Sequence, residues 1–191
     1  MAGLVFAMTH VEICRWNQLA ALPECGRWLA ELDQVFFSSS ARQSFASAEE
    51  KAAFRERWLG RYLTHFPQCA FIALDSGGRA VGYVVGSLRD PACDPLFADL
   101  TFLAHFGALT ARYPAQLHIN LDADWRSKGI GAQLVDAFSD LARSERAPGV
   151  HVVTAEGMRN VRFYLANGFV ERGTAAVEGR TLLFLGRDTG L

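Results

Sequence analysis

One segment constrains the fold more than any other: an alternating strand that leads through a glycine-containing turn into an amphipathic helix. Residues 117–121 read Leu-His-Ile-Asn-Leu, the pattern of a half-buried strand. Residues 126–131 form the turn, and the helix after it is marked by Ile130, Leu134, Phe138 and Leu141. A second apolar strand is predicted at 150–155. The unit therefore predicts two parallel strands joined by a right-handed crossover.

The turn has the chemistry of a phosphate site. It reads Arg-Ser-Lys-Gly-Ile-Gly, and the start of a helix offers unpaired N–H groups and a partial positive charge to an anion. Glycines let the backbone approach closely or adopt positive φ. A P-loop would need Ser or Thr after Gly-Lys, and the dinucleotide fingerprint fails because its last position is Leu134. These two phosphate motifs are excluded, and a turn that binds some other phosphate ligand stays open.

The remaining pattern, R-x-x-G-x-G between a strand and a helix, resembles the acetyl-CoA signature of the GNAT (Gcn5-related N-acetyltransferase) superfamily. Downstream, Tyr164 followed by Gly168-Phe169 matches the family's short helix. The chain departs from the family at Ala123, where Pro is common, and at Gly157, where Asn is common. Asn160 lies close to the second departure.

This resemblance implies an acetyl-CoA-dependent N-acetyltransferase in which an amine attacks the thioester directly. It implies an α/β (α+β) fold, with a mixed central sheet flanked by helices and a helical insertion before the central strand. The implied cofactor contacts are Ile119, Asn120 and Leu121 for the pantetheine arm, Arg126, Ser127, Lys128, Gly129, Ile130, Gly131 and Ala132 for the pyrophosphate, and Asn160, Phe163 and Tyr164 on the short helix. No metal is expected.

A narrower resemblance concerns the insertion and residues 113–119, which are similar to the acetyltransferase-like domain of O-GlcNAcase and its bacterial relatives. Some of those domains are suspected of having lost catalysis. A non-catalytic acetyl-CoA-binding module is therefore the alternative function.

Two side chains are the catalytic candidates. An amine with a pKa of about 10.4 is neutral in only roughly one molecule in a thousand at pH 7, so a general base helps the attack. His118 is the predicted base, because its position resembles one where the family often places Glu and its unperturbed pKa is near neutrality. Tyr164 is the predicted acid for the leaving thiolate. The alternative for His118 is a histidine hydrogen-bonded within the sheet, and the alternative for Tyr164 is a core tyrosine. For His151, the sequence does not predict which face of its strand the side chain takes.

The other elements follow from periodicity and turn signals. A strand or lead-in is expected at about Val5–Ile13, and an amphipathic helix around 28–36. A capping box at Ser47 opens a helix with an aromatic stripe, and core packing is the expected role of that stripe, which consists of Phe54, Trp58, Tyr62 and Phe66. Residues 70–74 and 80–88 are predicted to form a hairpin. Residues 96–113 are predicted to be one helix, 161–167 a short helix closed by Gly168, and 169–171 and 181–186 a closing pair of strands.

Composition limits the remaining possibilities. The 191 residues predict one domain over 1–191, and a net charge of −1 offers no general attraction to nucleic acid or an anionic membrane. Four widely spaced cysteines, without a C-x-x-C pair, favour reduced thiols in a cytoplasmic protein. Neither a secretory signal nor a membrane span is predicted. The expected partner is a small-molecule or protein amine, and the chain is expected to be a monomer or a homodimer.

Overall fold

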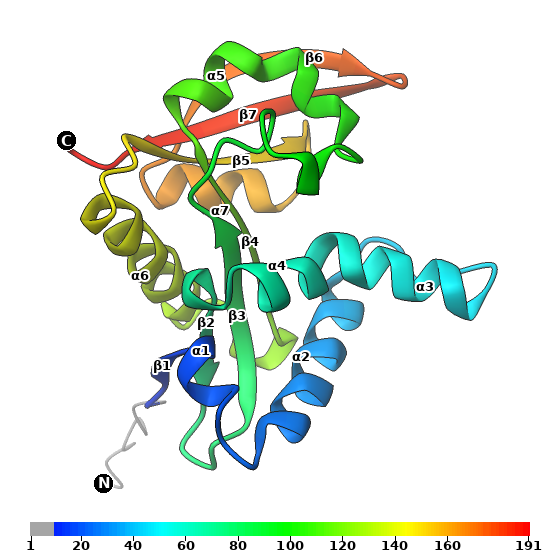
Figure 1. Ribbon diagram of the computed structural model, residues 1–191, viewed down its shortest axis with the longest axis vertical. Coiled ribbons are helices and arrows are strands. Elements are labelled where there is room, and N and C mark those ends of the chain that lie inside the picture. The colour runs from blue at the N-terminus through cyan, green and yellow to red at the C-terminus, as the bar shows by residue number, and fades with distance from the viewer. Residues whose placement is uncertain (1–9) are drawn as a thin grey trace, which may run out of the picture.

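A seven-stranded mixed sheet organises the protein, whose computed structural model describes residues 10–191 (Figure 1). The strand order is β1-β2-β3-β4-β5-β7-β6. The strands are β1 (Glu12–Arg15), β2 (Phe71–Leu74), β3 (Ala80–Ser87), β4 (Ala115–Leu121), β5 (Gly149–Ala155), β6 (Val170–Val177) and β7 (Arg180–Asp188). All neighbours are antiparallel except β4 and β5, which are parallel as predicted. The predicted mixed α/β architecture is confirmed.

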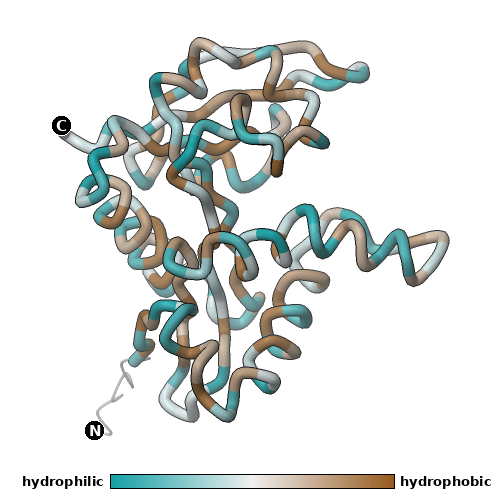
Figure 2. The backbone as a smooth tube through the Cα atoms, viewed as in Figure 1, coloured by the Kyte–Doolittle hydropathy of each residue, from teal (hydrophilic) through white to brown (hydrophobic). Residues whose placement is uncertain are grey.

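Helices cover both faces of the sheet. Helix α2 (Cys25–Ser39) buries Leu32, Val35 and Phe36 against β3 and β4, and helix α4 (Arg61–His65) packs on β3. Helix α6 (Ile130–Ser144) covers the opposite face, where Phe138 lies against Gly86 of β3. Figure 2 shows hydrophobic and hydrophilic residues alternating around α2 and α6, as expected for amphipathic helices. None of the helices within residues 10–191 combines the length and apolarity needed to span a membrane.

Most predicted elements lie where the sequence places them. Ser47 caps helix α3 (Ala48–Arg55), and the chain continues through a π-helical turn (Glu56–Gly60) into α4. The hairpins β2–β3 and β6–β7 form, although the second is longer than predicted. Gly168 follows helix α7 (Asn160–Ala166) with φ +80°, the expected C-terminal geometry. Of the strand expected at Val5–Ile13, residues 5–9 lie outside the described residues, and within the described part the strand begins at Glu12.

The single helix predicted over 96–113 is wrong. The segment forms two 3₁₀ helices (Pro95–Phe97 and Thr101–Phe106) and then the short helix α5 (Gly107–Arg112). The apolar residues recur at every third position, and Phe97, Leu100, Leu103 and Phe106 are all buried. A repeat of 3.0 residues is the period of a 3₁₀ helix, so the chain tightens its turns to keep these side chains in the core.

The two parallel strands β4 and β5 separate soon after they meet. Their ladder pairs Ala115 with Val150 and Gln116 with His151, and it ends there. Beyond Gln116, β4 stays paired with β3 on its other side as far as Leu121. The edge of β4 that faces β5 is therefore without a strand partner from Leu117 to Leu121.

Candidate functional site at the end of the central strand

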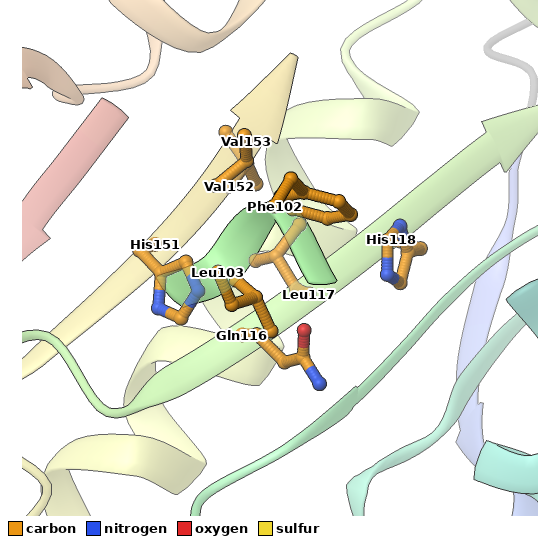
Figure 3. A pocket seen from close by; sticks show the side chains of 8 residues that line it. All are labelled: Phe102, Leu103, Gln116, Leu117, His118, His151, Val152 and Val153. Atoms are coloured by element: carbon orange, nitrogen blue, oxygen red, sulfur yellow. The ribbon is translucent and has the colours of Figure 1, made fainter. Parts of the chain in front are cut away.

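A small pocket lies at the point where β4 and β5 diverge. Its lining comes from three segments: Phe102 and Leu103 of the insertion, Gln116, Leu117 and His118 of β4, and His151, Val152 and Val153 of β5 (Figure 3). Apolar groups form most of the lining, and the two imidazoles and the Gln116 amide provide its polar part. The Nε2 of Gln116 is buried and has no partner among the described residues. The pocket places His118 and His151 beside the gap between the strands.

The turn after β4 presents a row of free backbone donors. A short 3₁₀ segment (Ala123–Trp125) follows the strand, and α6 begins at Ile130. The N–H groups from Ser127 to Ala132 have no hydrogen-bond partner among the described residues. Gly129 precedes the helix at φ +79° and Ser127 has φ +59°, so the backbone folds into a concave loop. Such a loop at a helix N-terminus binds anions.

Arg126 stabilises this turn through hydrogen bonds. Its Nε donates to the carbonyl of Leu121 at 3.2 Å, and its guanidinium also donates to the Ser39 hydroxyl at 3.2 Å. Ser39 in turn donates to the same Leu121 carbonyl at 3.1 Å. The predicted phosphate ligand Arg126 therefore ties the turn to β4 and α2, and its charge stays beside the turn. Ser39 is a contributor that the sequence did not reveal, because it is one of three consecutive serines, at 38–40, that carry no motif.

Lys128 lies at the outer side of the turn. Its ammonium stands over the Trp125 ring, 4.9 Å from the ring centroid, and no ion pair engages it within residues 10–191. A cation–π contact at an exposed site is worth only about 0.5–1 kcal/mol, so it does not fix the side chain firmly. Lys128 thus remains a charge that an incoming anion can use.

Gly131 joins the turn to helix α7. A Cβ at this position would lie 2.8 Å from Cε2 of Phe163 and 3.2 Å from Cδ1 of Leu121. The structure therefore brings together Leu121, Gly131 and Phe163, three residues that the sequence assigned to the cofactor. Gly131 is therefore needed for the close packing of the turn against α7 and β4, in addition to any part in anion binding.

Asn160 and Gly157 lie at the entrance to α7. Gly157 has φ +77° with open space around its missing side chain, a conformation that both Gly and Asn tolerate. Asn160 accepts a hydrogen bond from the Thr154 hydroxyl at 3.0 Å. The Asn160 side chain therefore ties α7 to the end of β5.

His118 lies on the face of β4 that α4 covers. Its Nε2 is 3.0 Å from the Tyr62 hydroxyl, and its ring packs against Trp58 and Tyr62, with centroids 4.9 and 5.3 Å away. Burial lowers the pKa of His118 to about 3, and the nearby His151 and Arg61 act in the same direction. His118 is therefore neutral at physiological pH.

His151 is fully enclosed. Its Nδ1 donates to the Tyr113 carbonyl, its ring stacks on Phe184 at 4.7 Å, and burial lowers its pKa to about 4. It faces the same pocket as His118, which answers the question that the sequence left open. The hydrogen bond to Tyr113 gives this histidine a structural role between β5 and the insertion.

Tyr164 is a buried side chain of α7, packed between Phe163 and Phe169 with centroids 5.3 Å from each. Its hydroxyl has no hydrogen-bond partner among the described residues. Burial raises the pKa of Tyr164 far above its usual range, so the phenol stays protonated. No ring contact or hydrogen bond within residues 10–191 joins it to His118.

An ion-pair cluster borders the His118 side of the site. Asp99 of the insertion receives both terminal nitrogens of Arg61 at 2.7 Å and the Nε of Arg57 at 2.7 Å. Arg61 also donates to the Leu96 carbonyl at 2.8 Å. These bonds fix the insertion to α4, and they occupy the carboxylate. No group of three or more His, Cys, Asp or Glu side chains suited to a metal ion occurs in the described part of the chain.

Comparisons with known proteins identify the family and the fold. A model of the acetyltransferase (GNAT) family matches residues 29–169. Among solved structures, SsHAT has a TM-score of 0.70 at 23% identity, covering 95% of this chain and 99% of that one. PH1933 from Pyrococcus horikoshii OT3 has a TM-score of 0.69 at 17% identity, with 95% and 100% covered. An N-acetyltransferase from Staphylococcus aureus Mu50 has a TM-score of 0.62 at 14% identity, with 95% and 99% covered.

At these identities the solved structures show a shared fold. A search of curated proteins finds no match to the chain.

Proposed function

The chain belongs to the acetyltransferase (GNAT) family, and from this membership we propose that it transfers the acetyl group of acetyl-CoA to an amine by direct attack on the thioester. The observation that carries the proposal is the juxtaposition at the end of β4. An unpaired strand edge, a row of free N–H groups and a positively charged turn follow one another over Leu117–Ala132.

Each part of this juxtaposition suits one part of the cofactor. Backbone groups of Ile119, Asn120 and Leu121 would pair with the pantetheine arm as an added strand does. The N–H groups of residues 127–132 would hold the pyrophosphate at the start of α6, with Lys128 supplying charge. Arg126 supports the turn through Ser39 and Leu121, and Phe163 and Asn160 fix α7 beside it.

Two side chains are proposed to act on the reacting atoms. Tyr164 keeps its proton, and its hydroxyl has no hydrogen-bond partner within residues 10–191, so it can donate to the leaving thiolate. His118 lies beside the gap in which the thioester would sit. The general-base role that the sequence analysis assigned to His118 stays a prediction.

The cysteines bear on the cellular setting. All four cysteines are free thiols, which supports the proposal of a reducing, cytoplasmic location. The proposed acceptor is a small-molecule or protein amine, and monomer and homodimer both remain compatible with the proposal.

The test is an acetyl-transfer assay with acetyl-CoA and a panel of benzylamine, tryptamine, spermidine, Nα-acetyl-lysine and short peptides with free N-termini. Release of free CoA that depends on one of these amines, with mass spectrometry showing the acetylated product, is the expected result. Tight CoA binding without transfer to any amine would instead identify the non-catalytic acetyl-CoA-binding module.

The substitution Tyr164→Phe is expected to lower kcat about 10- to 100-fold, because it removes the proton donor and leaves the ring between Phe163 and Phe169. The affinity for CoA, measured by calorimetry, should change less than threefold. Steady-state kinetics with the amine found in the panel provides the measurement. An unchanged kcat would remove Tyr164 from the catalytic groups.

A further inference from the structure

The partner of His118 decides which of its ring nitrogens carries hydrogen. Tyr62 is completely buried, and the only hydrogen bond of its hydroxyl within residues 10–191 is the 3.0 Å contact with His118 Nε2. Burial raises the pKa of Tyr62 far above its usual range, so its hydroxyl keeps the proton. A buried donor left without an acceptor costs about 1–3 kcal/mol. The Tyr62 O–H therefore donates to Nε2.

A neutral imidazole has one donor and one acceptor nitrogen. Because Nε2 accepts from Tyr62, the hydrogen of neutral His118 is on Nδ1. Nδ1 has no hydrogen-bond partner among the described residues, and the histidine lines the pocket between β4 and β5. The site thus presents an N–H donor, where a general base would need a lone pair.

The charges around His118 oppose its protonation as well. Arg61 lies beside Tyr62 on α4, and His151 faces the same pocket from β5. The carboxylate of Asp99 is occupied by Arg57 and Arg61. An imidazolium would have no counter-ion within the described residues, and a base of such low basicity is poorly matched to reaction near pH 7.

We propose that Tyr62 is a positioning residue that holds His118 in the Nδ1–H tautomer, and that His118 donates this hydrogen to the carbonyl oxygen of the acetyl thioester. The inference rests on the proposed function and replaces the general-base role expected for His118. It also implies that the acceptor amine reaches the site already neutral.

The step balances as follows. The amine nitrogen attacks the carbonyl carbon, a C–N bond forms, and the carbonyl π pair moves to the oxygen, which accepts the hydrogen bond from Nδ1–H. Collapse of this oxyanion breaks the C–S bond, and Tyr164 gives its proton to the departing thiolate. The extra proton on nitrogen leaves to water, and Tyr164 recovers a proton from water. A preorganised donor to an oxyanion is usually worth about 10²- to 10³-fold in kcat.

The test is ¹⁵N NMR of the full chain labelled at histidine, near pH 7. The His118 resonances are assigned by their loss in His118→Asn. We expect a protonated Nδ1 and a bare Nε2 for His118 in the free protein, and a mixture of tautomers in Tyr62→Phe, which keeps the aromatic ring. A protonated Nε2 in the wild-type protein would overturn the proposal.

The same sample is then titrated with acetyl-CoA and, separately, with CoA. Acetyl-CoA should shift the His118 Nδ1–H resonance downfield, whereas CoA, which lacks the thioester carbonyl, should leave it near its free position. Equal shifts with both ligands would contradict the carbonyl contact. The NMR measurement does not depend on turnover. If the chain bound acetyl-CoA without transferring the acetyl group, the proposed function would fail, and the spectrum would still show which nitrogen of His118 is protonated.

A kinetic pair adds an independent measurement. In a Tyr62→Phe background, His118→Asn keeps an N–H donor near the position of Nδ1, whereas His118→Leu removes it. The Asn variant should lose about tenfold in kcat and the Leu variant about 10²- to 10³-fold. Equal losses in both variants would favour a base at His118 and overturn the donor role.

Discussion

Lowering the pH from about 7 to about 4 should remove several kcal/mol from the free energy of unfolding, because His151 is buried and His118 is half-buried, both in the neutral form. Burial lowers the pKa of His118 to about 3 and that of His151 to about 4, against about 6.5 in an unfolded chain. Below about pH 6.5 the unfolded chain takes up protons that the folded one excludes. This stability is thus fully present above about pH 6.5 and declines as the pH falls towards 4.

His151 alone should account for about 3 kcal/mol of that loss, since each pKa unit corresponds to about 1.4 kcal/mol and its side chain is only 1% exposed. Urea denaturation at a series of pH values measures it. His151→Gln should flatten the pH dependence, whereas His105→Gln, at an exposed position, should leave it unchanged. A His151→Gln variant with the wild-type pH dependence would contradict the assignment.

The second large effect is expected at Gly131. Gly131→Val would force a side chain into the space held by Phe163 and Leu121, whose nearest atoms lie 2.8 and 3.2 Å from the position of a Cβ. Overpacking of this kind costs about 1–3 kcal/mol. Because the displaced residues belong to β4 and α7, which lie on either side of the turn, the affinity for CoA should also fall by at least about tenfold, roughly the equivalent of 1.4 kcal/mol.

Gly26→Val is the matched control. Gly26 is the second residue of α2 as Gly131 is of α6, both helices have 15 residues, and no atom outside the local helix lies within 4 Å of a Cβ built at Gly26. This variant should change stability by less than about 1 kcal/mol and leave CoA binding intact. Equal effects at the two glycines on CoA affinity, measured by calorimetry, would show that the junction of turn and α7 has no part in binding.

The fold was predictable where local patterns and tertiary packing agree. Three local patterns each predict one structure, and all three structures form: the alternation of β4, the apolar face of α6 and the glycine at the end of α7. The insertion differs from its prediction, because a three-residue apolar repeat resembles the apolar stripe of an α-helix and yet fits 3₁₀ turns better. The prediction of one domain over residues 1–191 stays a prediction.

The candidate site was predictable at its backbone and less so at its side chains. Gly129 and the free N–H groups follow from the turn itself. Tyr62, however, belongs to an aromatic stripe that sequence assigns to the core, and it is indeed core; only the fold shows that its hydroxyl meets His118, 56 residues away. Ser39 and Arg126 meet across 87 residues in the same way. Contacts of such long range have no periodic signal in one sequence.

The central claim is that the turn after β4 binds the pyrophosphate of CoA. Calorimetric titration of the full chain with CoA, and with ATP and NAD under the same conditions, tests it most directly. The account predicts one CoA bound per chain, with an affinity at least about tenfold above that of either nucleotide, and a weaker affinity in Gly129→Val, whose side chain opposes the φ of +79°. Binding of ATP or NAD as tightly as CoA would contradict it.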